Sequence, residues 1–426
     1  MTKSRAVSLS QFTPLPLLAL LLCGCATPAG KGTTATEDRA FIEYWPPPKG
    51  STKPRLAVKD LIDMKGKVTS AGSQYFLKHG LPAERDAVCL RGARGRVDIV
   101  GKTNLTEFAI SPSGANSYFG MPENQVARSR HRISGGSSSG SAVALANREA
   151  DIAFGTDTAG SIRLPAACCG IFGLKTTFGR ISTKGVYPIS AKYLDTVGPM
   201  ARDIPGLVLG MDLLEPGFHG EYEAAVAAKP RARQIRVGQL YVEGTRPDMD
   251  DAVDAALRAH GFKVVRLSKA FSDAWKEADD NAQIVAHSAA WLQNNQLQDQ
   301  PEVSALSKLI IASGKLTYDQ NYGDALKGRK PWQATLRRAF REVDVIALPT
   351  VKTIPPLIRP VDGVLFESWI LSLQNTAAVN FAGNPAIAVP IPIENHKMPG
   401  SIEFIGPMNS EAQLLNVGRL ISTRVK

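Results

Sequence analysis

Short apolar runs alternate with helical patterns along the first half of the chain. Residues 56–58, 98–100 and 151–154 are apolar runs that turn or polar residues end, which is typical of buried strands. Between the last two, the small apolar residues 142–146 predict a helix that packs on a sheet. Strands that alternate with helices in this way predict an α/β fold.

The same order returns in the second half. Residues 235–240 predict a strand, and residues 248–260 predict an amphipathic helix that ends at Gly261. Residues 262–265 predict the next strand, so a βαβ crossover is the simplest arrangement. The later predicted elements are strands at 343–348, 386–389 and 401–405 and a closing helix at 411–422.

The N-terminus has the pattern of an export signal. Lys3 and Arg5 form a short positive region, and the apolar run 15–22 that follows is too short to span a bilayer. The next segment, Leu22-Cys-Gly-Cys25, resembles the lipobox of bacterial lipoproteins, in which the last Cys receives lipid after cleavage. We therefore expect residues 1–24 to be a lipoprotein signal peptide and Cys25 to be the lipidated first residue of the mature protein.

This interpretation predicts where the protein is located. Residues 25–53 are expected to be a linker between the lipid anchor and a folded domain. Acyl chains on Cys25 would tether that domain to a membrane. Ala26, rather than Asp, follows Cys25, which resembles the sorting pattern of Gram-negative lipoproteins for the outer membrane. We expect an exported protein that faces the periplasm.

Composition narrows the class of protein. The chain has 426 residues, of which 44% are hydrophobic and 21% charged, and this balance excludes a disordered or collagen-like chain. The formal net charge of +11 favours contact with anionic lipid, but no long basic block interleaved with aromatic residues indicates a nucleic-acid partner. The six His have no metal-ligand spacing, and Cys168 and Cys169 lie in a small-residue run typical of a core. Neither a metal nor a cofactor is expected.

Two loops rich in glycine and serine contain the candidate chemistry. Residues 135–141 and 155–161 each form such a loop, and Lys59 follows an apolar run. Together they supply the parts of a serine–lysine hydrolase. An alternative is that residues 136–140 match the G-x-S-x-G elbow, which would make Ser138 the nucleophile, but no apolar strand precedes them. The first loop also lacks the ending of a phosphate-binding P-loop.

In this order, the segments closely resemble the amidase signature family. The resemblance is strong over about residues 54–204, and the matching segments are Ala57-Val-Lys59-Asp-Leu, Gly101-Lys-Thr-Asn-Leu, Gly135-Gly-Ser137-Ser138-Ser-Gly, Gly155-Thr-Asp157-Thr158-Ala159-Gly160-Ser161-Ile-Arg163 and Asp195-Thr-Val-Gly-Pro-Met. The resemblance implies that residues 54–426 form one α/β/α domain around a twisted mixed β-sheet.

The resemblance also implies a role for each motif residue. Ser161 would be the nucleophile, Ser137 the bridging serine on a cis peptide bond, and Lys59 the base. A serine hydroxyl needs a neighbour that takes its proton, and a lysine can do so only when burial leaves it neutral. The implied oxyanion hole consists of the backbone N–H groups of Thr158, Ala159, Gly160 and Ser161, and the implied supporting residues are Ser138, Asp157 and Arg163.

The implied activity is hydrolysis of an amide, through an acyl-enzyme on Ser161, to an acid plus ammonia or an amine. The substrate would be a small-molecule or peptide amide, whose identity the sequence does not specify; nor does it specify the oligomeric state. Two alternatives remain open, an esterase that uses the same triad and a noncatalytic surface-binding lipoprotein. The export signal disfavours the tRNA amidotransferase members of that family. At position 159, an Ala replaces the Gly that is usual in the family.

Overall fold

One large sheet organises the computed structural model, which describes residues 35–125, 131–358, 363–394, 396 and 398–422. Its strands are β1 (Phe41–Tyr44), β2 (Arg55–Lys59), β3 (Asp98–Thr103), β4 (Ile152–Asp157), β5 (Phe172–Lys175), β6 (Thr196–Ala201), β7 (Arg236–Gln239), β8 (Lys263–Arg266), β9 (Val345–Pro349), β10 (Ala386–Ile391) and β11 (Gly400–Ile405). They form an eleven-stranded sheet in the order β1-β3-β2-β4-β6-β5-β10-β11-β9-β7-β8. The sheet is mixed, because β2 and β4 are parallel whereas β10 and β11 are antiparallel.

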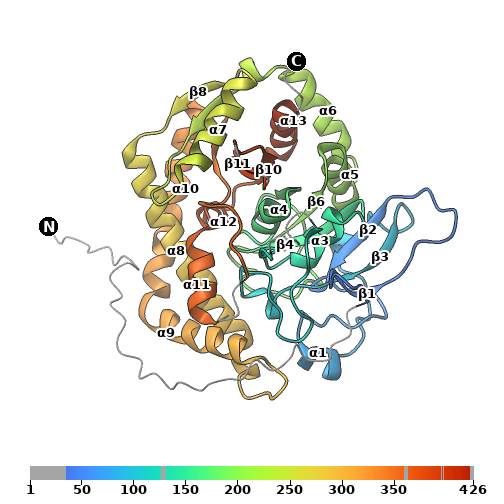
Figure 1. The fold of residues 1–426 in the computed structure, drawn as a ribbon. Coiled ribbons are helices and arrows are strands. Elements are labelled where there is room, and N and C mark those ends of the chain that lie inside the picture. Colours follow the sequence, from blue (N-terminus) through green and yellow to red (C-terminus); the bar gives the residue numbers. More distant parts are fainter. Residues whose placement is uncertain (1–34, 126–130, 359–362, 395, 397, 423–426) are drawn as a thin grey trace.

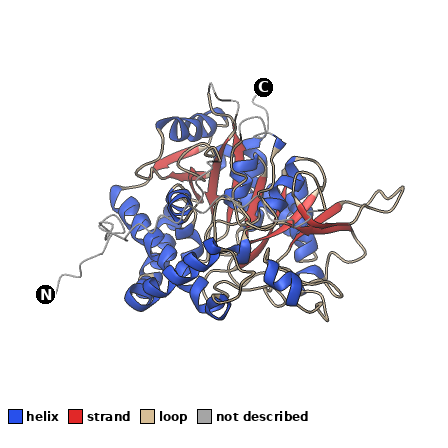
Figure 2. Ribbon diagram, turned by 60° about the horizontal axis from the view of Figure 1, so that its bottom comes forward, coloured by secondary structure: helices blue, strands red, loops and turns tan. Residues whose placement is uncertain are grey.

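Helices cover both faces of this sheet (Figure 2). They are α1 (Gln74–His79), α3 (Ser139–Ala146), α4 (Arg163–Cys169), α5 (Ile204–Leu214), α6 (Phe218–Ala228), α7 (Pro247–Ala259), α8 (Lys269–Asn294), α9 (Ala305–Lys327), α10 (Arg329–Glu342), α11 (Val364–Ser372), α12 (Ala377–Ala382) and α13 (Glu411–Ser422). Along β9, Val345 and Ala347 pack with α5, α7 and α13, whereas Ile346 and Leu348 pack with α8, α10 and α12. Successive side chains of a strand point to opposite faces. The predicted α/β/α architecture is therefore confirmed.

Most elements predicted from the apolar runs are present. The predicted strands at 56–58, 98–100 and 151–154 lie within or overlap β2, β3 and β4, and the predicted helix at 142–146 lies within α3. The βαβ crossover is confirmed as well, since β7 and β8 are parallel neighbours that α7 connects. Strands β2, β3 and β4 and helix α3 are largely buried, so their apolar pattern follows from the fold, whereas every residue of β8 is exposed.

Part of the predicted linker 25–53 belongs to the sheet instead. Strand β1 pairs with β3 in antiparallel register, and both Ala40 and Phe41 are fully buried. The Asn104 N–H also donates to the Ala40 carbonyl oxygen at 2.9 Å. Burial of these two apolar residues ties the segment to the domain although polar and proline-rich sequence surrounds them. Cys25 and the predicted signal peptide lie outside the described residues.

A pair of long helices, α8 and α9, stands beside the sheet (Figure 1). Helix α8 packs Trp275, Ala278 and Ala282 into the core, in contact with α10 and α12. Residues of the same helix line one cavity together with residues of the loops that follow β4 and precede α3. In the described part of the chain, no helix is long and apolar enough to cross a membrane.

Candidate active site

The structure places Lys59 at the end of a central strand and in contact with Ser137. Lys59 is the last residue of β2 and is fully buried. Its Nζ donates to Ser137 Oγ at 2.7 Å and to Thr156 Oγ1 at 2.8 Å. Because β2 and β4 are parallel neighbours, Thr156 on β4 reaches the lysine from the adjacent strand. The ammonium or amine group thus has two fixed hydroxyl neighbours.

Burial changes the acid–base character of Lys59. Loss of water lowers its pKa to about 7, and the attraction of the Asp157 and Asp195 carboxylates opposes this only in part. A free lysine has a pKa near ~10.4. At neutral pH a large fraction of Lys59 is therefore neutral and can accept a proton.

Ser137 lies in the loop before α3. The Gly136–Ser137 peptide bond is cis, as the family resemblance implied. Ser137 and Ser138 are both fully buried. The Ser138 N–H donates to the Ser161 carbonyl oxygen at 3.2 Å, and its hydroxyl donates to the Thr156 carbonyl oxygen at 3.3 Å. Ser138 therefore joins the two glycine–serine loops, and its hydroxyl faces the backbone of β4.

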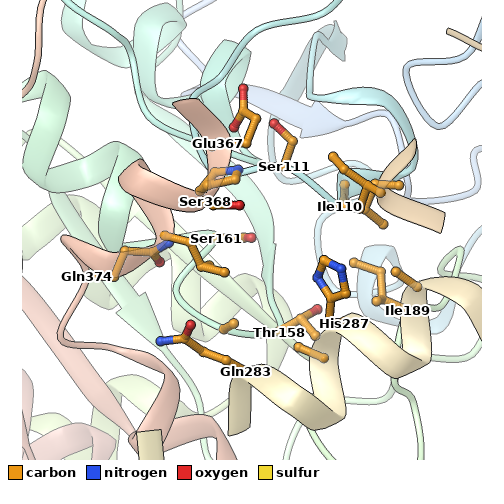
Figure 3. A pocket seen from close by; sticks show the side chains of 18 residues that line it. Ile110, Ser111, Thr158, Ser161, Ile189, Gln283, His287, Glu367, Ser368 and Gln374 are labelled. Atoms are coloured by element: carbon orange, nitrogen blue, oxygen red, sulfur yellow. The ribbon is translucent and has the colours of Figure 1, made fainter. Parts of the chain in front are cut away.

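Ser161 opens onto a cavity that has an empty volume of about 780 Å³ including its opening to solvent (Figure 3). Gly136, Thr158 and Ala159 line the same cavity. The other polar side chains of the lining are Ser111, Gln283, His287, Glu367, Ser368 and Gln374, and the rest are mainly Ala, Ile and Leu. Of the two candidate nucleophiles, Ser161 faces this cavity, whereas Ser138 is not among its lining residues.

Asp157 shapes the loop that holds Ser161. Its carboxylate accepts from the Gly160 N–H at 2.8 Å and from the Ile162 N–H at 3.1 Å. The Gly160 amide is therefore engaged, and it could reach a substrate oxygen only by leaving Asp157. In the described structure no hydrogen bond uses the amides of Thr158, Ala159 and Ser161, so these three remain available as donors to a substrate oxygen.

A buried ion network fixes Asp157. Arg163 and Asp157 pair at 2.9 Å, and Arg163 also pairs with Glu403 at 2.6 Å, all without solvent exposure. Although burial alone would raise it, the adjacent Arg163 holds the pKa of Asp157 well below its usual range. Burial raises the pKa of Glu403 to about 7 despite Arg163. Asp157 and Arg163 thus support the loop from behind, as the family resemblance implied, and do not line the cavity.

Residues 374–376, far along the chain, pack against the same loop. Thr376 Oγ1 donates to the Ala159 carbonyl oxygen at 2.6 Å. Gly160 has a φ of +132°, and a Cβ there would lie 2.2 Å from Thr376 Oγ1 and 2.7 Å from Gln374 Oε1. Only glycine fits this position. The sequence motif contains this glycine. Nothing in the local sequence of residues 374–376 indicates that they pack against it.

Other buried groups lie away from the cavity. Lys175 also has a pKa lowered to about 7 by burial, but its Nζ donates to the Thr176 and Asn384 carbonyl oxygens. Cys168 and Cys169 are buried in the core as predicted, and burial raises the pKa of Cys168 to about 12. Within the described residues, no cluster of His, Cys, Asp and Glu could hold a metal ion.

The chain belongs to the Amidase family, whose model matches residues 55–415. It is 31% identical over 376 residues to 2-amino-5-chloromuconic acid deaminase of Comamonas testosteroni, a match that covers 85% of this chain and 79% of that protein. It is also 31% identical over 411 residues to a glutamyl-tRNA(Gln) amidotransferase subunit of Thermosynechococcus vestitus, covering 85% of this chain and 82% of that protein.

Solved structures agree with this assignment. A structure described as a vestigial complex that reveals the origins of an s-triazine catabolic enzyme superposes with a TM-score of 0.74 at 28% identity. The match covers 89% of this chain and 87% of that one. Together the family and its relatives identify an amidohydrolase that acts on C–N bonds.

Proposed function

We propose that the protein hydrolyses amides through an acyl-enzyme on Ser161, with Ser137 and Lys59 as its proton-transfer partners. The observation that carries this proposal is the buried contact of 2.7 Å between Lys59 Nζ and Ser137 Oγ, beside the loop that presents Ser161 to the cavity. A serine becomes a good nucleophile only when a base takes its proton. Lys59, with its lowered pKa, is the available base.

The proposed reaction begins with attack of Ser161 Oγ on the amide carbonyl carbon. As the C–O bond forms, the Ser161 proton passes to Ser137 Oγ, and the Ser137 proton passes to neutral Lys59. The carbonyl oxygen becomes an oxyanion, to which the amides of Thr158, Ala159 and Ser161 would donate. Such donors typically contribute about 3 kcal/mol each to the transition state.

Collapse of this intermediate breaks the C–N bond. Ser137 delivers a proton to the leaving nitrogen and recovers one from Lys59, so that ammonia or an amine departs and Lys59 is neutral again. A water molecule then repeats the sequence on the ester that joins the acyl group to Ser161. The products are a carboxylic acid and the free serine.

Kinetics of three serine variants test this assignment. Ser161→Ala is expected to abolish hydrolysis of a panel of primary amides, anilides, peptide amides and esters. Ser137→Ala should lower the rate strongly, because Ser161 then loses its proton relay. If Ser138→Ala abolished activity while Ser161→Ala did not, Ser138 would replace Ser161 as the nucleophile.

We also propose that the enzyme is exported and lipid-anchored through Cys25, with the catalytic domain in the periplasm. The support comes from the sequence of the N-terminus, where Lys3 and Arg5 precede a short apolar run and the Leu22-Cys-Gly-Cys25 lipobox. Diacylglycerol and an amide-linked chain on one Cys supply enough buried CH₂ groups for stable anchoring. The natural substrate is then an amide present outside the cytoplasm.

A further inference from the structure

One face of helix α8 forms a polar wall of the cavity. Gln283 and His287 lie one turn apart on this helix and both line the cavity (Figure 3). Side chains at i and i+4 share a helix face. Their neighbours on that face, Ala286 and Ala290, are small, and Ile189 lies beside His287 in the view. The two polar side chains are therefore accessible to a molecule in a largely apolar space.

The orientation of the Gln283 amide is determined by Asp279, one turn earlier. Gln283 Nε2 donates to Asp279 Oδ2 at 2.7 Å, and the Ala378 N–H donates to Asp279 Oδ1 at 3.2 Å. An ionised carboxylate can only accept, so the amide nitrogen of Gln283 must face it. Burial raises the pKa of Asp279 to about 6, which leaves it mainly ionised at pH 7 and above. Gln283 Oε1 consequently points into the cavity, as Figure 3 shows.

The protonation of His287 follows from Ser313. The hydroxyl of Ser313 donates its single proton to the Ile310 carbonyl oxygen at 2.9 Å. The same oxygen lies 2.7 Å from His287 Nε2, and with its proton on the Ile310 carbonyl oxygen the hydroxyl accepts from the ring N–H. Burial lowers the pKa of His287, which keeps the imidazole neutral. Nδ1 then carries the free lone pair, and the ring presents an acceptor.

We infer that Gln283 and His287 determine specificity by accepting hydrogen bonds from an amino group that the acyl chain of the substrate carries. The inference rests on the proposed role of Ser161, because the acyl chain is the part of the substrate that stays bound through both steps. When the bound group has no hydrogen-bond donor, the two acceptors of Gln283 and His287 stay unpaired in an apolar space, and this weakens binding of that substrate. The Asp279 carboxylate behind Gln283 adds negative charge, which attracts an ammonium group and repels a carboxylate.

The test uses matched primary amides that end in a methyl, an amino or a carboxylate group, with acyl chains of three to six carbons. For the best chain length, the wild-type enzyme should show a kcat/KM at least about tenfold higher for the amino-ended amide than for the methyl-ended one. In Gln283→Met this ratio should fall to about threefold or less. Because both rates are measured on one variant, a loss of folded enzyme does not alter the ratio.

Two further variants complete the design. Gln296→Met makes the same chemical change at an exposed position after α8 and should keep the wild-type ratio. His287→Phe removes the second acceptor and should also lower the ratio of the kcat/KM values for the amino-ended and methyl-ended amides. This variant keeps the inference testable if Gln283→Met does not fold. A wild-type ratio near one, a preference for the carboxylate-ended amide, or an unchanged ratio in Gln283→Met would overturn the inference. Failure of the proposed function would be seen separately, as amide turnover by Ser161→Ala.

Discussion

Lys59 Nζ lies 2.7 Å from Ser137 Oγ, and neither residue is exposed to solvent. Asp157 and Asp195 exert the attraction that favours a charged lysine, but neither forms an ion pair with it among the described contacts. Desolvation therefore dominates, and the lysine can remain neutral near pH 7. This contact connects a strand of the sheet to the loop that carries Ser137.

The first prediction concerns pH. Protonated Lys59 cannot accept a proton, and its neutral fraction grows as the pH rises through its pKa of about 7. We therefore expect kcat/KM to increase with pH, with a midpoint near 7 rather than near the ~10.4 of a free lysine, and then to level off. Lys59→Met should lose most activity together with this pH dependence.

Lys175 provides the control for that experiment. Its pKa is also lowered to about 7, but it contacts backbone carbonyl oxygens away from the cavity. Lys175→Met should keep the rise of kcat/KM near pH 7, whatever its overall rate. If Lys175→Met lost the pH dependence and Lys59→Met kept it, the role of base would pass to Lys175.

A second prediction concerns Thr156, for which the sequence motif implied no role. Its hydroxyl accepts from Lys59 Nζ at 2.8 Å and so fixes the direction of the lysine toward Ser137. Thr156→Val keeps the shape but removes this acceptor, and it should lower kcat/KM by about tenfold, the value of one hydrogen bond. Thr156→Ser should restore most of the rate. Equal rates for the valine and serine variants would show that the hydroxyl does not position Lys59.

The buried ion network should dominate local stability. Arg163→Leu would leave the Asp157 and Glu403 carboxylates buried without their partner. Such a loss typically costs about 3–5 kcal/mol of unfolding free energy, which urea denaturation can measure. Arg94→Leu removes an exposed pair with Asp86 and should cost less than about 1 kcal/mol. Similar losses of unfolding free energy in the two variants would contradict the claim that burial makes the Arg163 ion pairs more important for stability.

The fourth prediction addresses the N-terminus. Native protein should partition into the membrane fraction and the detergent phase, because a processed lipoprotein carries several acyl chains. Cys25→Ser should accumulate as unprocessed precursor, and a chain that begins near Lys31 should be soluble and fully active. Mature protein in the cytoplasm with residues 1–24 intact would show that this segment is not an export signal.

The apolar patterns predicted most of the buried strands but missed β5 and β6, which are also buried but whose sequences are interrupted by Gly and by Gly-Pro. Residues 151–154, for example, predict β4 because nearly every position of that strand faces the core. Strand β1 escaped prediction because it is an edge strand, in which only Phe41 and Ile42 are buried. Its apolar signal is therefore too short to separate from the linker around it.

The candidate site likewise contains some residues that the sequence predicts and others that it does not. Lys59, Ser137 and Ser161 belong to short contiguous motifs that can be read directly from the sequence. Gln283 and Thr376 come from segments more than a hundred residues later, and only tertiary packing brings them to the Ser161 loop. Their local sequences, an amphipathic helix and a helix start, are the same whether or not they line a cavity.

The most direct test of the account is to locate the covalent adduct of a fluorophosphonate probe. Ser161 Oγ should attack phosphorus, forming a P–O bond as the P–F bond breaks and fluoride leaves, so peptide mass mapping should place the added mass on Ser161. Labelling should be absent in Ser161→Ala and reduced but detectable in Ser137→Ala. An adduct on Ser138, or undiminished labelling of Ser161→Ala, would contradict the assignment of Ser161 as the nucleophile.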